Sequence, residues 1–144
     1  MERAVKRRNA ERWRTLKARL SREMTIWLTT VRADGRPHLV PVWFVWLDGK
    51  LYFATGSETQ KFSNLHHNQA VALALPDTAS VIILEGEAHA SDRATTEAVA
   101  EYFYNKYEWD FRYDESMDWR LVEVTPLKIL AWGDQHDGDG IRVL

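Results

Sequence analysis

Two Asp-Gly pairs place the strongest constraint on how this chain folds. Asp34-Gly35 separates the run WLTTVR from RPHLVPVWFVW, and Asp48-Gly49 separates this second run from KLYFAT. An Asp-Gly pair between β-rich runs favours a type I′ hairpin turn, because that turn needs positive φ at both central residues. The stretch from Trp27 to Asn68 therefore predicts two successive hairpins, followed by a loop and a short helix.

The loop after the third run carries the groups of a predicted anion site. The run ends at Thr55-Gly56-Ser57, and Lys61 falls in the first turn of the helix predicted at about 59–67. Backbone N–H groups at a helix start attract anions, and two hydroxyls and a lysine add to that attraction. The neighbouring run VPVWF is apolar and aromatic. Together they suit a phosphorylated, flat, conjugated ligand.

Composition favours one soluble globular domain spanning 1–144. The chain has 144 residues, of which 45% are hydrophobic and 28% charged. No run approaches the roughly 18–20 apolar residues that a membrane span needs, and the first residues are charged rather than of secretory type. The absence of cysteine excludes disulfides, thiolate metal ligands and a cysteine nucleophile. We therefore expect a cytoplasmic protein without a membrane partner.

Charge divides the chain into a basic N-terminal helix (1–22) and an acidic barrel (23–144). The first segment carries nine Lys or Arg against two Glu, a net charge of +7, while the remainder carries a net charge of −9. Such asymmetry favours an anionic partner for the first segment. The alternative is a solvated amphipathic helix whose basic side faces water. Nucleic acid is not the expected partner, because no reader motif and no aromatic platform accompany the arginines.

The remaining patterns complete a mainly β, α+β fold. Pro41 predicts an edge strand or a bulge, Gly86 a bend, and Ser91 or Asp92 a helix cap. The last strand is interrupted at Pro126. We predict helices at 2–20, 59–67 and 93–107, and strands at 24–32, 37–47, 50–55, 70–75, 79–90 and 121–132. Six antiparallel strands with flanking helices predict a small β-barrel.

Three sequence pieces, in this order and spacing, carry a resemblance to a known family. They are T-x-x-x-D-G-R-P-H-x-V-P-V-W-F, D-G-x-L-Y-F-A-T and K-x-x-N-L-x-x-N. The chain resembles the FMN-binding split β-barrel superfamily, also called the pyridoxamine 5′-phosphate oxidase-like family, from about residue 24 onward. It is most similar to the small members that use FMN or a deazaflavin. The resemblance implies a Greek-key split barrel and a homodimer with two cofactors in clefts between the subunits.

The resemblance also implies a set of cofactor-binding residues. The second strand would contact the isoalloxazine ring, largely through its backbone, at Leu39, Val40, Pro41, Val42, Trp43 and Phe44. The phosphate would be held by Thr55, Ser57 and Lys61, the loop braced by Asn64, and the flavin site completed by Trp132 and Arg142. The family motif has Arg where this chain has Gln60 and Lys where it has Phe44. These departures argue against true pyridoxamine phosphate oxidation.

The implied function is a flavin-dependent oxidoreductase that transfers hydride to or from a small organic substrate. The cofactor carries that chemistry, so no residue is assigned a catalytic role. FMN and the deazaflavin coenzyme F(420) both remain candidates. The basic segment slightly favours coenzyme F(420), which has an oligoglutamate tail. The substrate pocket is expected in the loop from Tyr107 to Trp119.

Two alternatives from other classes remain open. The first is a haem-binding or haem-degrading split barrel, which needs an axial histidine. None has a distinctive placement among His38, His66, His67, His89 and His136. The second is a non-catalytic module that stores cofactor or binds an anionic polymer through residues 3–22.

No metal site is predicted. His66 and His67 are adjacent on a helix and point about 100° apart. The acidic stretch with Asp134, Asp137 and Asp139 lacks the bidentate Glu of a calcium loop.

Overall fold

The computed structural model describes residues 2–134 and 141–142, without the side chains of 5, 6, 8, 9, 141 and 142. His136, Asp137 and Asp139 therefore lie outside the described residues. The helices are α1 (Glu2–Arg22), α2 (Gln60–His67), α3 (Arg93–Tyr107) and a short 3-10 turn, η1 (Phe111–Tyr113). The strands are β1 (Ile26–Val31), β2 (Pro37–Val42), β3 (Val45–Leu47), β4 (Lys50–Gly56), β5 (Ala70–Ala74), β6 (Ser80–Ala90), β7 (Trp119–Gly133) and β8 (Ile141–Arg142).

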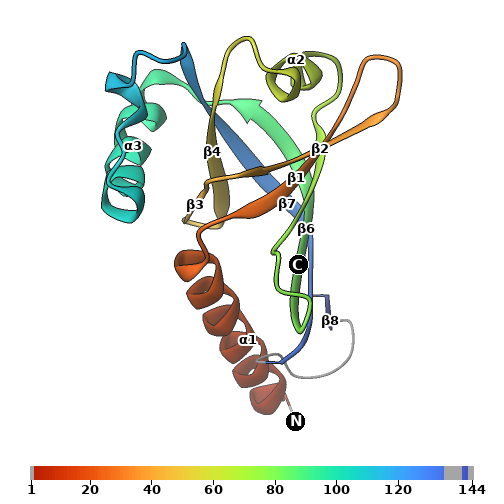
Figure 1. The fold of residues 1–144 in the computed structure, drawn as a ribbon. Coiled ribbons are helices and arrows are strands. Elements are labelled where there is room, and N and C mark those ends of the chain that lie inside the picture. The colour runs from red at the N-terminus through yellow and green to blue at the C-terminus, as the bar shows by residue number, and fades with distance from the viewer. Residues whose placement is uncertain (1, 135–140, 143–144) are drawn as a thin grey trace.

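The described strands form one curled antiparallel sheet with the order β2-β1-β5-β6-β7-β4-β3, and β8 pairs with β7 (Figure 1). This confirms the mainly β split-barrel fold with flanking helices. All six predicted strands are present, but the described sheet has eight. The predicted strand 37–47 is divided into β2 and β3, because the chain leaves the ladder at Trp43 and Phe44. The short β8 adds the other strand.

The two Asp-Gly pairs form different turns. Asp48 and Gly49 have φ of 51° and 78°, as a type I′ turn requires. At the other pair only Gly35 has positive φ, 89°, so the predicted type I′ turn is wrong there. Instead the Gly35 N–H donates to the Arg32 carbonyl at 2.8 Å, and the Asp34 carboxylate accepts from the backbone N–H of Arg36 at 3.1 Å. The Asp34 side chain thus stabilises a longer loop.

The long strands β6 and β7 contain a bulge that helps the sheet to curl. Their register shifts between Glu85 and Gly86, where Gly86 faces Pro126 and Leu127 has no partner across the ladder. A Cβ on Gly86 would lie 2.3 Å from the Thr125 carbonyl oxygen, so only glycine fits here. The predicted bend at Gly86 and the interruption at Pro126 are therefore one feature.

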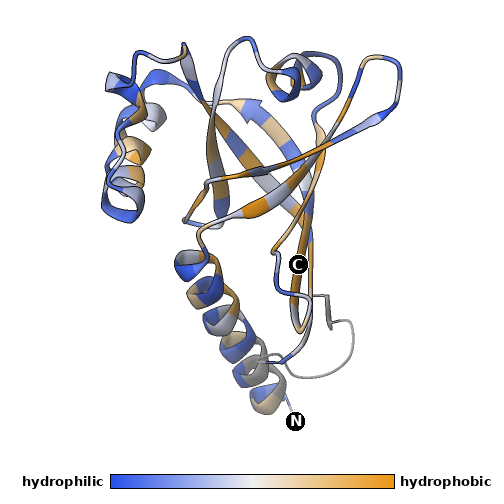
Figure 2. Ribbon diagram, viewed as in Figure 1, coloured by the Kyte–Doolittle hydropathy of each residue, from blue (hydrophilic) through white to orange (hydrophobic). Residues whose placement is uncertain are grey.

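The core lies on the inner face of the curled sheet. Leu28, Phe53, Leu84 and Ile129 have exposed fractions of 0%, and Leu16 and Leu20 of α1 join them. Figure 2 shows hydrophobic residues concentrated in the strands, whereas α1 is mainly hydrophilic. The helix α3 begins where predicted, because the Asp92 carboxylate accepts from the Thr95 N–H at 2.7 Å. No helix in the described part of the chain is both long and apolar enough to cross a membrane.

The outer sheet face carries an apolar row of residues. Residues opposite each other in an antiparallel ladder share a face, so the register gives one row across β2, β1, β5, β6 and β7. We define the outer sheet face by this row, which consists of Pro41, Trp27, Ala74, Ile83 and Leu130. Trp27 is 41% exposed. Pro41 belongs to β2, at one edge of the sheet, as proline in a strand predicted.

Candidate functional site

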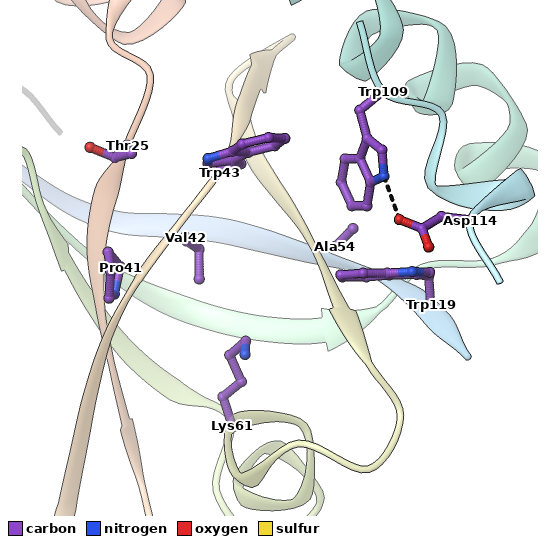
Figure 3. A pocket seen from close by; sticks show the side chains of 9 residues that line it. All are labelled: Thr25, Pro41, Val42, Trp43, Ala54, Lys61, Trp109, Asp114 and Trp119. Carbon is purple, nitrogen blue, oxygen red and sulfur yellow. Dashed lines mark hydrogen bonds between the residues drawn. The ribbon is translucent and has the colours of Figure 1, made fainter. Parts of the chain in front are cut away.

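A cleft of about 450 Å³ lies between the end of β2, β4, α2 and the loop that follows α3 (Figure 3). Its size falls within the range of small-molecule sites. Its walls are mainly apolar, with one lysine and one aspartate among them. The lining residues are Thr25, Pro41, Val42, Trp43, Ala54, Lys61, Trp109, Asp114 and Trp119.

Three tryptophans form the aromatic part of the cleft. Trp109 meets Trp43 edge to face, with ring centroids 5.6 Å apart and an interplanar angle of 85°. It meets Trp119 in the same way, at 4.8 Å and 80°. Trp43 also stacks on Tyr107 at 4.6 Å and 3°, so one face of its indole is covered. Ring faces and edges of this kind suit a flat, conjugated ligand.

The C-terminal end of α3 fixes the position of Trp43. The Phe44 N–H donates to the Tyr107 hydroxyl at 3.0 Å, and that hydroxyl lies 2.8 Å from the Met24 carbonyl oxygen, to which it can donate. The Lys106 ammonium donates to the Phe44 carbonyl at 3.0 Å and lies 4.0 Å from the centroid of the Phe44 ring. These contacts satisfy the backbone where the chain leaves the ladder, and they hold Trp43 at the cleft.

Tyr107 and Lys106, which together clamp the backbone of Phe44, both have pKa values shifted by burial. It lowers the pKa of Lys106 to about 8, because desolvation disfavours the ammonium, although the charge of Glu23 acts in the opposite direction. It raises the pKa of Tyr107 to about 12, so the phenol is neutral at physiological pH. The Tyr107 hydroxyl can therefore both accept and donate in the clamp.

Lys61 supplies the positive end of the cleft. It extends from the first turn of α2 into the cleft, as Figure 3 shows, and burial lowers its pKa. Among the described residues no carboxylate forms an ion pair with it. His38 lies close enough that, after burial, the charges of Arg32 and Lys61 further lower its pKa. The positive charges of Lys61 and Arg32 therefore make this end of the cleft suitable for binding an anion.

The other residues of the predicted phosphate site have internal partners. Thr55 is buried, and its Oγ1 lies 2.8 Å from Oγ1 of Thr59, the N-cap of α2. Asn64 is also buried and donates to the Thr30 hydroxyl at 2.9 Å, so it braces the helix against β1. Ser57 lines a separate hollow with Glu58 and Asp118 rather than the cleft with Lys61.

Asp114 supplies the negative end of the cleft. Its carboxylate accepts from the Ser116 hydroxyl at 2.5 Å, from the Ser116 N–H at 2.9 Å and from Trp109 Nε1 at 2.8 Å. These hydrogen bonds, those from Ser116 first, lower the pKa of Asp114 to about 2. The carboxylate is therefore ionised at neutral pH.

The predicted ring-binding strand reaches the cleft in part. Pro41, Val42 and Trp43 line it, whereas Leu39 is 59% exposed on the outer side of β2 and Phe44 is fully buried in the core. Val40 packs against the core. The predicted ring contact is therefore restricted, within one chain, to the last part of the segment.

The two predicted C-terminal residues lie apart from the cleft. Trp132 pairs with Val81 near the far end of β7, and the cleft is lined by Trp119 at the start of the same strand. The backbone of Arg142 belongs to β8, but its side chain lies outside the described residues. Neither residue is brought to the cleft of its own chain by the described structure.

The sequence did not single out five of the lining residues as cofactor contacts. Trp109, Asp114 and Trp119 come from the loop that was predicted to build a substrate pocket, and its acidic, aromatic composition was the available signal. Thr25 and Ala54 carry no such signal, because only the curl of the sheet brings them to the cleft. Among the described residues, no three His, Cys, Asp or Glu lie close enough to hold a metal ion.

Comparisons with known proteins agree with this architecture. Residues 13–133 match the profile of a family described as pyridoxamine 5′-phosphate oxidase. No curated protein matches the chain at a significant level. A Listeria innocua protein described as a candidate pyridoxamine 5′-phosphate oxidase superposes with a TM-score of 0.69 at 20% identity, over 84% of this chain and 98% of its own.

Two further solved structures share the fold but differ in what they are named for. An F(420) reductase superposes with a TM-score of 0.64 at 25% identity, over 78% of this chain and 94% of its own. A haem-binding protein of Mycobacterium smegmatis superposes with a TM-score of 0.75 at 18% identity, over 93% of this chain but only 57% of its own. One fold therefore serves proteins of different function.

Proposed function

Because the chain belongs to the pyridoxamine 5′-phosphate oxidase family, as the match over residues 13–133 shows, we propose that it is a flavin-dependent oxidoreductase. It binds FMN or the deazaflavin coenzyme F(420) in the Lys61 cleft. The observation that carries this proposal is one half-buried lysine without an ionic partner among the described residues, in the same cleft as three tryptophans. When bound, the cofactor supplies the hydride chemistry.

The chain's own residues bind and orient the cofactor. Lys61, supported by the charge of Arg32, holds the phosphate, and the N-terminus of α2 adds its dipole. The ring lies along the backbone from Pro41 to Trp43, next to the Lys61 end of the cleft. Thr55 and Asn64 contribute by fixing the loop and α2, because their polar atoms already have partners.

Two observations bear on the choice of cofactor and reaction. The F(420) reductase has the same fold at 25% identity, and α1 carries the basic residues that suit an oligoglutamate tail. Both favour coenzyme F(420) over FMN. Phe44 is buried and Gln60 donates to Asn64 at 2.7 Å, so neither replaces the basic residue of the oxidase motif. True pyridoxamine phosphate oxidation is accordingly not the proposed reaction.

We also propose that the protein is a homodimer in which a second copy covers the outer sheet face. That face carries an apolar row across five strands, and Pro41 belongs both to this row and to the cleft. Trp132 lies on the same face, because it follows Leu130 by two residues on β7. A second copy would therefore close the open side of the cleft, and one chain alone has an incomplete site.

The decisive experiment is parallel titration of the protein with FMN and with coenzyme F(420), followed by a test of which reduced form is turned over. Lys61→Ala should weaken binding of the preferred cofactor roughly 10- to 100-fold, because one charge-assisted contact to phosphate is lost. Lys61→Arg should retain most of the affinity. Lys17→Ala, an exposed lysine of α1 outside the cleft, is the control for FMN.

Other results would point to the remaining candidates. Unchanged affinity of Lys61→Ala for both cofactors would contradict the proposal. A Soret band on haem titration would favour a haem protein, although none of the described histidines lines the cleft. Binding of an anionic polymer that is lost on deletion of residues 3–22, without turnover of either cofactor, would favour a non-catalytic module.

A further inference from the structure

The end of the cleft away from Lys61 has the composition of a cation-binding cage. Trp43, Trp109 and Trp119 surround it, and Asp114 lies between the last two in Figure 3. The free face of Trp43 is turned away from Tyr107, on which its other face stacks. Indole faces attract cations more strongly than any other aromatic side chain does, because of the negative charge above and below the ring.

Asp114 differs from its two neighbouring aspartates because no cationic side chain in the described part of the chain pairs with it. Asp110 pairs with Arg112 at 2.6 Å, and Asp118 pairs with Arg120 at 2.9 Å. Among the described residues Asp114 forms no such pair, and its acceptor bonds come from the uncharged groups of Ser116 and Trp109. The cleft therefore contains a negative charge that the described protein does not neutralise.

The bond from Trp109 Nε1 to Asp114 joins the two features. A donor that binds a carboxylate becomes more electron-rich, so this indole attracts a cation more strongly than an unbonded one. The same bond orients the carboxylate beside the ring. The tryptophan rings thus offer van der Waals contact, and the carboxylate offers a negative charge. Both lie at the end of the cleft opposite the proposed phosphate site.

We propose that this cage binds a cationic, flat organic substrate, such as one with a quaternary ammonium or an N-alkylpyridinium group. Asp114 provides the counter-charge, and Trp43, Trp109 and Trp119 contact the cation. The inference rests on the proposed function, because it assigns the substrate class to the same cleft whose other end holds the cofactor phosphate. Lys61 keeps a cation out of the phosphate end, so the two charges orient the two ligands.

Two isosteric probes test the charge requirement. Titration calorimetry with 3-(trimethylammonio)phenol and with 3-tert-butylphenol compares a cation with a neutral molecule of the same shape. The cation should bind at least about 5-fold more tightly, as expected for about 1 kcal/mol of cation–π and ionic attraction. Asp114→Asn should remove most of that preference and leave the affinity for 3-tert-butylphenol within about 2-fold. Asp118→Asn, which alters a neighbouring aspartate paired with Arg120, should preserve the preference.

A nuclear magnetic resonance measurement shows where the probe binds. The indole N–H signal that disappears in Trp109→Phe should shift when the cation is added to the unaltered protein. Equal affinity for the two probes, an unaltered preference in Asp114→Asn, or a stationary Trp109 signal would overturn the inference. Titration of the same samples with FMN and coenzyme F(420) separates the two proposals. If a cofactor binds but the cation is not preferred, only the cage fails; if neither cofactor binds, the proposed function fails.

Discussion

The inner and outer faces of the curled sheet are made of similar side chains in different surroundings. On the inner face Leu28, Leu84 and Ile129 are 0% exposed, since α1 and the curl of the sheet enclose them. On the outer face Trp27 and Leu39 are 41% and 59% exposed. The comparison teaches that hydrophobic alternation assigns residues to a face but does not say what covers it. The inner face is buried within one chain, whereas the outer face is the surface that the proposed second copy would cover.

The largest expected effect concerns the inner face. Phe53→Ala removes a fully buried ring and should lower the free energy of unfolding by about 3–5 kcal/mol, through lost burial and a cavity. Urea denaturation at a fixed protein concentration measures this value. Leu127→Ala is the control, because Leu127 is 58% exposed at the bulge and its loss should change the value by less than about 0.5 kcal/mol. Similar values for the two variants would contradict the contrast between buried and exposed apolar side chains.

A charge on the outer face should act on assembly rather than on folding. Trp27→Lys should weaken self-association by about 2–4 kcal/mol, since an apolar anchor is replaced by an unpaired charge. Sedimentation velocity over a dilution series measures the association constant. Tyr113→Lys, at a residue 78% exposed on η1, should have no effect on it. A wild-type protein that is monomeric at all concentrations would show that this face needs no second copy.

The clamp at Trp43 and Phe44 lies where the chain passes from β2, at one edge of the sheet, to β3, at the opposite edge. Tyr107→Phe keeps the ring that stacks on Trp43 but removes the hydroxyl that accepts from the Phe44 N–H. Leaving that donor without a partner should lower the free energy of unfolding by about 1–3 kcal/mol. The affinity for the cofactor should fall as well, because Trp43 loses its support. Tyr104→Phe, at an exposed tyrosine of the same helix, should change neither quantity.

The smallest expected effect is a dependence of stability on pH. Burial lowers the pKa of Lys106 from 10.5 to about 8, so between these values the unfolded chain binds more protons than the folded one. The free energy of unfolding should therefore rise from pH 8 to pH 10, by on the order of 1 kcal/mol, because solvent still reaches the lysine. Above pH 10 it should fall, since burial raises the pKa values of Tyr52 and Tyr107 to about 12.

Urea denaturation of Lys106→Met at pH 8, 9 and 10 isolates the lysine. The rise should become smaller, leaving the contribution of Lys61, whose pKa burial also lowers. Lys17→Met, at an exposed position, should retain the full rise. An unaltered rise in Lys106→Met would show that Lys106 is as well solvated in the folded chain as in the unfolded one.

Local signals predicted most of the fold. The turn at Asp48-Gly49 and the cap at Asp92 act through their own backbone or through residues three positions away, so the local sequence contains every residue of the interaction. The division of strand 37–47 could not be predicted in this way. It depends on Tyr107, which lies 63 residues from Phe44 along the chain.

The candidate site was predicted less completely, for a similar reason. Lys61 reaches the cleft as expected, but the hydroxyl of Thr55 already has Thr59 as its partner, which the resemblance alone could not indicate. The pairing of Trp109 with Asp114 was missed, because an aromatic, acidic loop becomes a site only when it folds over the sheet. The roles of Trp132 and Arg142 in the flavin site stay predictions. Trp132 could reach a cofactor only in a second copy, and the side chain of Arg142 lies outside the described residues.

Gly86 limits how this scaffold can be redesigned. Any larger residue there would collide with the Thr125 carbonyl, and the two longest strands could no longer pass each other at that angle. To widen or narrow the cleft, this glycine should therefore be kept and residues 108–118 varied. The strands beneath this loop would tolerate insertions and replacements in it.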